Sequence, residues 1–344
     1  MNSSNEPIIS VSGLKTAFRM GKEEALAIED VAFEIGAGET LAIVGESGSG
    51  KSVTALSVMG LIPNPPGRVV GGEILFGGKD LLKCSAKEMR LTRTHDISMI
   101  FQEPMTSLNP VFRIDTQISE VYRLHKGMNK RDARDASIEM LKRVGIPAPE
   151  IRIDEYPHQL SGGMRQRVMI AIALACDPVL LIADEPTTAL DVTIQAQILD
   201  LLQEMQAEYQ MAMMLITHDL GVVAEMADRV HVMYGGRVVH TADADTLFES
   251  PQHPYTFGLF ESLPDMDGRQ VTLPTIEGYV PPINDFPSGC RFHPRCPYAM
   301  DLCETQVPSL TPTSLGDEVA CWLHDRATME ARGSSIGIPK VSST

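Results

Sequence analysis

An eight-residue pattern near the start of the chain, G-E-S-G-S-G-K-S, brings three glycines and one lysine into a single short loop. The apolar segment Thr40 to Val44, which predicts a buried strand, precedes it, and Ser52 to Leu61, which has helical composition, follows it. In this strand-loop-helix setting the backbone N–H groups of the loop surround phosphate groups, and the helix N-terminus adds positive partial charge. The phosphate-binding residues expected from the pattern are Gly45, Glu46, Ser47, Gly48, Ser49, Gly50, Lys51 and Ser52.

This loop pattern is specific enough to predict nucleotide binding. Average residue usage produces it by accident in roughly one chain of this length in a hundred, before the flanking strand and helix are considered. Lys51 is expected to reach the β and γ phosphates, and Ser52 is expected to ligate magnesium. A chance glycine-rich turn is the alternative, and the surrounding pattern argues against it.

Two carboxylates follow a second apolar segment, Val179 to Ala183. Open α/β sheets bind their ligands at the carboxyl ends of strands, so Asp184 is expected to hold magnesium and Glu185 to polarise an attacking water. An acidic loop that only solvates the end of a strand is the alternative. Together with the phosphate-binding loop, the pair favours hydrolysis of a nucleoside triphosphate.

Short apolar segments and helical periodicity organise the first 250 residues into an α/β fold. Ile8 to Val11 and Ala27 to Ile35 indicate an N-terminal antiparallel β-subdomain. Apolar residues at helical spacing between Arg113 and Ile151 indicate a helical insertion subdomain at about residues 103–160. Beyond it, strands alternate with helices, which predicts a mainly parallel sheet covered on both faces. These later helices and strands are expected at 163–175, 179–183, 192–208, 211–217, 230–234 and 237–241.

Charge and apolar run length exclude two classes of partner for the chain itself. The formal net charge of −16 argues against nucleic acid, because nonspecific binding to a phosphate backbone depends on clustered Lys and Arg. The longest apolar runs, such as Val168 to Ala175, are much shorter than the roughly 18 to 20 residues that span a bilayer. Since the start of the chain also lacks a signal-peptide pattern, we expect a cytosolic location.

The composition changes near residue 250, where prolines and glycines become frequent and cysteines gather. We therefore expect a nucleotide-binding domain over residues 1–250 and a small Cys-rich C-terminal extension over 251–344. Clustered thiols in a reducing compartment favour a metal site, and four thiolates suit either zinc or an iron–sulfur cluster. Gaps of five, six and seventeen residues lack the paired C-x-x-C spacing usual for zinc, and unligated or disulfide-linked cysteines are the alternative. The four candidate ligands are Cys290, Cys296, Cys303 and Cys321.

The segment Leu160 to Gln166, L-S-G-G-M-R-Q, resembles the signature motif of the ABC transporter ATPase family. The chain contains the family's motifs in the family's order and with similar spacing, and the resemblance covers about residues 8–325. It implies a P-loop NTPase core in an ABC ATPase domain. The motifs are the phosphate-binding loop, Gln102, the signature, Asp184 with Glu185, Asp191 and His218.

The resemblance implies a role for each matching residue. Gln102 would contact magnesium and water and sense the transmembrane partner, and His218 would contact the γ-phosphate. Asp191 would lie in a loop that contacts a second ATPase subunit. Phe18 is the nearest candidate for the adenine-stacking aromatic, and a core phenylalanine is the alternative.

The family also implies that two such domains enclose two ATP molecules between them. Each phosphate-binding loop would then face the signature of the other subunit, here Ser161, Gly162 and Gly163. ATP binding closes the pair, and hydrolysis with phosphate release reopens it.

Two further segments, Phe101 to Pro110 and His253 to Thr256, resemble the oligopeptide, dipeptide and nickel importer branch of the family. Gly289 to Pro297, with Cys303 and Cys321, resembles the tail of its peptide-importer ATPases and implies a 4Fe-4S cluster, with Zn²⁺ as the alternative.

The branch implies an ATPase subunit that powers uptake of short peptides from the cytoplasmic face of the inner membrane, as a peripheral subunit. Its partners would be a second ABC ATPase subunit, commonly a distinct paralogue, two transmembrane permease subunits and an extracytoplasmic substrate-binding protein. Three alternatives stay open: a nickel or other small-solute importer of the same branch, a soluble non-transport ABC ATPase, and a nucleotide-binding module that no longer hydrolyses ATP.

Overall fold

The computed structural model describes residues 6–188, 190–262, 275–325 and 328. Two sheets lie at the centre of the molecule. One has the strand order β2-β1-β4-β5, and the other has the order β11-β12-β10-β9-β3-β8-β7-β6. Parts of the predicted extension, residues 263–274 and 329–344, lie outside the described residues.

The smaller sheet is antiparallel and confirms the predicted N-terminal β-subdomain. Its strands are β1 (Ile9–Met20), β2 (Glu23–Ile35), β4 (Gly67–Phe76) and β5 (Lys79–Asp80). The first two are longer than the sequence predicted. The reason is a series of register shifts in β1 between Val11 and Ala17, because a bulge interrupts the alternation of polar and apolar residues that marks a strand.

The larger sheet is mixed, with a parallel centre. Its central strands are β3 (Thr40–Val44), β6 (Ile97–Ile100), β7 (Leu180–Asp184), β8 (Ala212–Thr217) and β9 (Arg229–Tyr234). These five are parallel neighbours in the order β9-β3-β8-β7-β6. Nearly all of their residues are buried, because helices or the smaller sheet cover both faces. The carboxyl ends of β3, β6, β7 and β8 therefore meet along one edge.

The antiparallel strands of the larger sheet begin with β10 (Arg237–Asp243), which turns back from β9 at Gly235 and Gly236 as predicted. Next come β12 (Glu318–Val319), which pairs with β10, and β11 (Thr311–Pro312). The larger sheet thus continues into residues close to the C-terminus.

Helices surround these sheets and form one end of the molecule. Those before the signature are α1 (Lys51–Val58), α2 (Ala86–Thr92), α3 (Pro104–Ser107), α4 (Ile114–His125), α5 (Lys130–Arg143) and α6 (Pro149–Arg152). The later ones are α7 (Gly162–Leu174), α8 (Val192–Tyr209), α9 (Leu220–Met226), α10 (Ala244–Glu249), α11 (Pro254–Glu261) and α12 (Asp301–Thr305). Among the described residues, every helix is too short or too polar to span a membrane.

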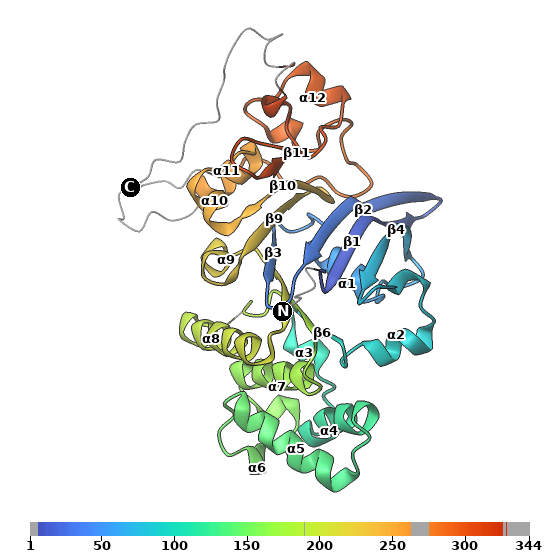
Figure 1. The fold of residues 1–344 in the computed structure, drawn as a ribbon, viewed down its shortest axis with the longest axis vertical. Helices are drawn as coiled ribbons and strands as arrows, with labels where there is room; N and C mark the ends of the chain where they lie inside the picture. The colour runs from blue at the N-terminus through green and yellow to red at the C-terminus, as the bar shows by residue number, and fades with distance from the viewer. Residues whose placement is uncertain (1–5, 189, 263–274, 326–327, 329–344) are drawn as a thin grey trace.

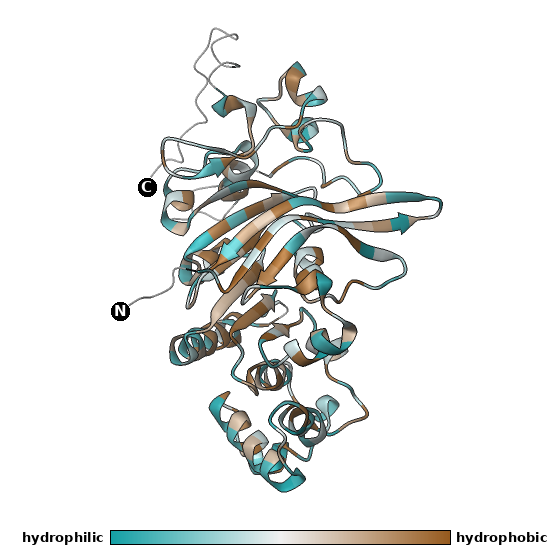
Figure 2. Ribbon diagram, turned by 45° about the vertical axis from the view of Figure 1, so that its right-hand side comes forward, coloured by the Kyte–Doolittle hydropathy of each residue, from teal (hydrophilic) through white to brown (hydrophobic). Residues whose placement is uncertain are grey.

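Figure 1 shows α4 to α7 at one end of the molecule and α12 at the other, with most strands of the two sheets between them. Hydrophobic residues gather in the central strands, whereas many residues of the outermost helices are hydrophilic (Figure 2).

The helix after the phosphate-binding loop ends earlier than the sequence predicted, at Val58 instead of Leu61. Gly60 has a φ of 59°, and its N–H group bonds to the carbonyl of Ser57, while that of Leu61 bonds to Leu56. These two bonds form a Schellman motif, which ends a helix at a glycine in the left-handed region. The composition of the segment is helical throughout, so only the conformation of Gly60 reveals the end.

Residues of the C-terminal extension pack into the same core as the larger sheet. Tyr234 of β9 makes ring contacts with Tyr255 of α11 at 4.8 Å and with Phe292 at 5.1 Å between centroids. All three rings are buried, and such pairs add about 1 kcal/mol each beyond the area they bury. The domain division at residue 250 stays a prediction, since this cluster joins residues on both sides of it.

His231 on β9 gives the fold a dependence on pH. Burial, and to a lesser extent the charge of Arg229, lowers the pKa of His231 from an ordinary 6.5 to about 3. The unfolded chain binds this proton below pH 6.5 and the folded chain does not, so the stabilising contribution is complete above pH 6.5 and is lost as the pH falls toward 3.

We expect His231→Leu to make the free energy of unfolding less dependent on pH below 6.5, by about 1 kcal/mol per pH unit. Denaturant unfolding at pH 7, 6 and 5 measures this slope for both proteins. Equal slopes would contradict the expectation, because a stability change of the same size at every pH is only a packing effect.

Candidate functional site

The phosphate-binding loop connects β3 to α1 and depends on Gly45. This residue has a φ of 150°, and an added Cβ atom would lie 2.3 Å from the carbonyl oxygen of Met233 on β9. The Nζ group of Lys51 lies across the loop and donates hydrogen bonds to the carbonyls of Gly45 at 2.6 Å and Glu46 at 3.0 Å. The lysine side chain is therefore already directed into the loop.

Burial lowers the pKa of Lys51, while the nearby carboxylates Glu185, Asp184 and Glu46 oppose this shift. The same lysine therefore lies between the loop and the carboxylates at the end of β7. An ammonium group in this position suits a highly charged anion such as a triphosphate.

Ser52 and Asp184 come together at the start of α1 and the end of β7. The hydroxyl of Ser52 donates a hydrogen bond of 3.1 Å to Oδ1 of Asp184. Burial is the main cause that raises the pKa of Asp184. Both residues, together with Gln102, line a cavity of about 580 Å³. The cavity therefore presents oxygen groups of the kind that magnesium prefers.

Glu185 is the centre of a hydrogen-bonded network at the same edge of the sheet. Its Oε2 accepts hydrogen bonds of 2.8 Å from Nε2 of Gln102 and from the hydroxyl of Thr188. Its Oε1 lies 3.1 Å from Nδ1 of His218. Because an ionised carboxylate only accepts hydrogen bonds, Nδ1 carries the proton in this pair.

The environment keeps Glu185 ionised and holds its backbone in an unusual conformation. Burial alone would raise the pKa of Glu185, but the hydrogen bonds from Thr188 and His218 and the charge of Lys51 leave it below its ordinary value. Its φ of 48° is uncommon for a residue with a side chain and costs about 1 kcal/mol or more. Such strain is concentrated at functional sites.

The sequence did not single out Thr188, which is the third polar partner of Glu185. A hydroxyl three positions after a carboxylate in a turn is too common a pattern to identify alone. Gln102 and His218 lie 83 and 33 positions from Glu185, and the shared carboxyl edge of β6, β7 and β8 brings them together.

The signature residues and Asp191 begin two helices and face outward. Ser161 accepts a hydrogen bond from the N–H group of Met164 at the start of α7, and Asp191 accepts one from Ile194 at the start of α8. Ser161, Gly162 and Asp191 are exposed. Their positions leave polar groups at both helix starts accessible to another molecule.

Phe18 lies on β1, half-buried, with its ring close to Gly67 of β4. An added Cβ atom at Gly67 would lie 2.7 Å from that ring. The aromatic ring therefore packs on the backbone of the neighbouring strand, and its role in adenine stacking stays a prediction.

The four C-terminal cysteines line one small cavity of about 10 Å³, together with His253 and Trp322. All four are free thiols, and the N–H group of Cys290 donates a hydrogen bond of 2.8 Å to the carbonyl of Cys303. Burial raises the pKa of Cys296 and Cys321 to about 12. In the described part of the chain, no group of three or more His, Cys, Asp or Glu side chains is placed to hold a metal ion.

Three features define a nucleoside triphosphatase of the P-loop class: the parallel sheet, the loop wrapped around Lys51 and the carboxylate pair at the end of β7. Comparison with known proteins specifies the family. Residues 28–188 match the ABC transporter family, and residues 239–303 match the oligopeptide/dipeptide transporter C-terminal region.

Two relatives resemble the chain over most of its length. The oligopeptide transport ATP-binding protein AppD of Bacillus subtilis (strain 168) is 53% identical over 323 residues, which cover 94% of this chain and 98% of that protein. The dipeptide transport ATP-binding protein DppD of Escherichia coli (strain K12) is 50% identical over 309 residues, which cover 89% of this chain and 94% of that protein.

Two solved structures share the fold. A dimeric ATP-binding cassette in a post-hydrolysis state, bound to ADP and phosphate, has a TM-score of 0.61 and 27% identity and covers 69% of this chain and 98% of its own. The cbiO1 protein of Clostridium perfringens has a TM-score of 0.59 and 30% identity and covers 71% of this chain and 91% of its own.

The chain belongs to the family of ATP-binding proteins of oligopeptide and dipeptide ABC transporters, and it is the ATPase subunit of a peptide importer. The predicted family, function and ATPase activity are confirmed.

Two glycines of the loop provide a matched test of its packing. We expect Gly45→Ala to lower the free energy of unfolding of the nucleotide-free protein by about 3 kcal/mol, because its Cβ atom would overlap Met233. Gly48→Ala should cost about 1 kcal/mol, since its φ is 81° but the space around it is open. Denaturant unfolding compares the two, and equal losses would show that the contact with β9 is unimportant.

Proposed function

We propose that this subunit hydrolyses ATP at the cluster of Ser52, Asp184, Gln102, Glu185 and His218. The observation that carries the proposal is the position of Glu185. This ionised carboxylate is held between Gln102 and His218, beside the cavity that Ser52 and Asp184 line. Glu185 polarises the water that attacks the γ-phosphate, and His218 contacts that phosphate.

The residues that would hold magnesium are Ser52, Asp184 and Gln102, whose oxygen atoms suit this hard cation. When bound, the ion offsets charge on the β and γ phosphates. Lys51 and the loop from Gly45 to Ser52 bind and orient those phosphates, and Phe18 stacks on the adenine.

Hydrolysis needs a second ATPase subunit in this proposal, and importers of the branch commonly use a distinct paralogue. The exposed Ser161 and Gly162 and the partly exposed Gly163 at the start of α7 would act on nucleotide bound mainly by that partner, and exposed Asp191 would contact it. One solved relative is described as dimeric, which supports the pairing.

The subunit would act at the cytoplasmic face of the inner membrane, as a peripheral partner of two permease subunits and an extracytoplasmic binding protein. Apolar side chains around α3 support a docking surface for the permeases, because contiguous exposed apolar groups mark interaction sites. Met105, Val111 and Phe112 are at least half exposed, and Phe101 beside Gln102 is partly exposed.

The domain organisation proposed with this function is an ATPase domain over residues 1–250, with a helical insertion at about 103–160, and an extension over 251–344. The insertion corresponds to α3 to α6, of which α4 to α6 lie at the opposite end of the molecule from α12, the helix that carries Cys303 (Figure 1).

In the assembled transporter, we expect Glu185→Gln to reduce the rate of ATP hydrolysis by about 10²-fold or more while ATP binding persists, because the amide cannot polarise water as a carboxylate does. Steady-state hydrolysis and equilibrium ATP binding measure the two effects. Glu204→Gln, the same change at an exposed position of α8, is the control. Hydrolysis by Glu185→Gln at the control rate would remove Glu185 from this role.

We also propose that Cys290, Cys296, Cys303 and Cys321 ligate a 4Fe-4S cluster, with Zn²⁺ as the alternative. All four line one cavity. Backbone N–H groups also approach three of the sulfurs, from Phe292 and His293 to Cys290, from Tyr298 to Cys296, and from Leu323 to Cys321. Such N–H groups stabilise thiolate ligands. When bound, a cluster supplies four iron–thiolate bonds that crosslink the extension.

Anaerobic purification is expected to give about four iron and four sulfide per chain, with visible absorbance. Cys296→Ser should lose most of the iron, whereas Cys84→Ser, a change at an isolated cysteine, should retain it. Stoichiometric zinc without iron would establish the alternative, and the absence of both metals would overturn a metal site.

A further inference from the structure

Arg295 connects the C-terminal extension to the phosphate-binding loop. It ends a short 3-10 helix, η3 (His293–Arg295), and its side chain is only 6% exposed. The guanidinium donates to both carboxylate oxygens of Glu46, from Nη1 at 2.6 Å and from Nη2 at 3.1 Å. Glu46 is the second residue of the loop, 249 positions away in the sequence. This bidentate geometry is the strongest form of such a pair.

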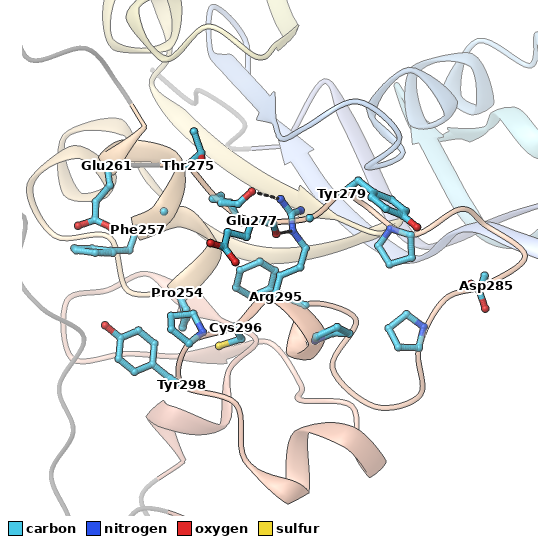
Figure 3. Close-up of a pocket in the computed structure, with 18 of the residues that line it drawn as sticks. Pro254, Phe257, Glu261, Thr275, Glu277, Tyr279, Asp285, Arg295, Cys296 and Tyr298 are labelled. Atoms are coloured by element: carbon cyan, nitrogen blue, oxygen red, sulfur yellow. Dashed lines mark hydrogen bonds between the residues drawn. The ribbon is translucent and has the colours of Figure 1, made fainter. Parts of the chain in front are cut away.

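The remaining donors of Arg295 are also used. Nε donates to the carbonyl of Glu277 at 2.8 Å, Nη2 to that of Ile276 at 3.1 Å, and Nη1 to the hydroxyl of Tyr234 at 3.4 Å. Figure 3 shows the arginine beside Glu277 at the wall of a cavity of about 950 Å³. An arginine has five N–H groups, and all five have acceptors here, so the guanidinium is held in one position.

A second group from the extension holds the backbone of the same loop residue. The N–H group of Glu46 donates a hydrogen bond of 2.8 Å to the hydroxyl of Tyr255, which is fully buried on α11. The carbonyl of Glu46 accepts the hydrogen bond from Lys51. Glu46 therefore forms hydrogen bonds both with Arg295 and Tyr255 and with Lys51, the proposed phosphate-binding lysine.

We propose that Arg295 is a positioning residue of the ATP site, which holds Glu46 so that the first turn of the phosphate-binding loop and Lys51 keep their binding geometry. The inference rests on the proposed role of the loop in ATP binding. In this proposal the C-terminal extension contributes to ATP binding through Arg295. The side chain of Glu46 is 28% exposed, so water can solvate its carboxylate when Arg295 is removed. We therefore expect Glu46 and its loop to become more mobile without unfolding of the protein.

The test uses the assembled transporter with Arg295→Ala, Glu46→Gln and the double variant. Each single change should raise the KM for ATP about tenfold, which corresponds to about 1.4 kcal/mol. The double variant should raise it no further, because both changes remove one interaction. The kcat at saturating ATP should stay within about twofold, since Glu185, Gln102 and His218 are untouched.

Arg295→Lys keeps the charge but loses the forked geometry, so its KM should lie between those of the wild type and Arg295→Ala. The control is Arg229→Ala, which breaks an ion pair of 2.8 Å with Glu39 at the opposite end of β3. It should lower stability without changing the KM for ATP.

An unchanged KM in Arg295→Ala and Glu46→Gln would overturn the inference, as would an equal rise in Arg229→Ala. If Arg295→Ala does not fold, Arg295→Lys and Glu46→Gln still decide the matter. Lys51→Ala tests the loop itself: wild-type ATP binding by this variant would refute the proposed function, whereas loss of binding together with neutral Arg295 variants refutes only the role of Arg295.

Discussion

The contact between the backbone of Gly45 and the carbonyl of Met233 is the constraint on which the ATP site depends. The phosphate-binding loop packs closely against β9 there, so no side chain fits at position 45. The loop can then curl around Lys51, whose ammonium rests on two of its carbonyls. Because β3 lies between β8 and β9, the same contact places the loop at the edge where Asp184 and Glu185 lie.

Electrostatics at this edge separate two adjacent carboxylates. Asp184 is buried at the end of β7 with its pKa raised, whereas hydrogen bonds from Thr188 and His218 and the charge of Lys51 outweigh burial and lower the pKa of Glu185, one residue further. The left-handed backbone of Glu185 turns the two side chains to different neighbours: Asp184 to Ser52, and Glu185 to Gln102 and His218. One carboxylate is thus suited to a metal ion and the other to a water molecule.

The C-terminal residues are joined to this arrangement by packing, strand pairing and charge. The ring cluster of Tyr234, Tyr255 and Phe292 belongs to the core under the larger sheet, and β12 extends that sheet through β10. Cysteine-lined and ATP-binding regions therefore share a core, although the composition changes sharply near residue 250. A change of composition reports what a segment is made of, and it does not report which surface the segment covers.

The sequence by itself determined the family, the loop, the carboxylate pair and most strands and helices, because these depend on local patterns: glycine spacing, apolar runs and motif order. It failed where local periodicity is interrupted, as at the bulges of β1, or where one glycine ends a helix, as at Gly60. Only the tertiary structure decided that Thr188 joins the Glu185 network and that Arg295 and Tyr255 hold Glu46. Those contacts join side chains whose positions are set by the packing of distant segments, and no local pattern records that packing.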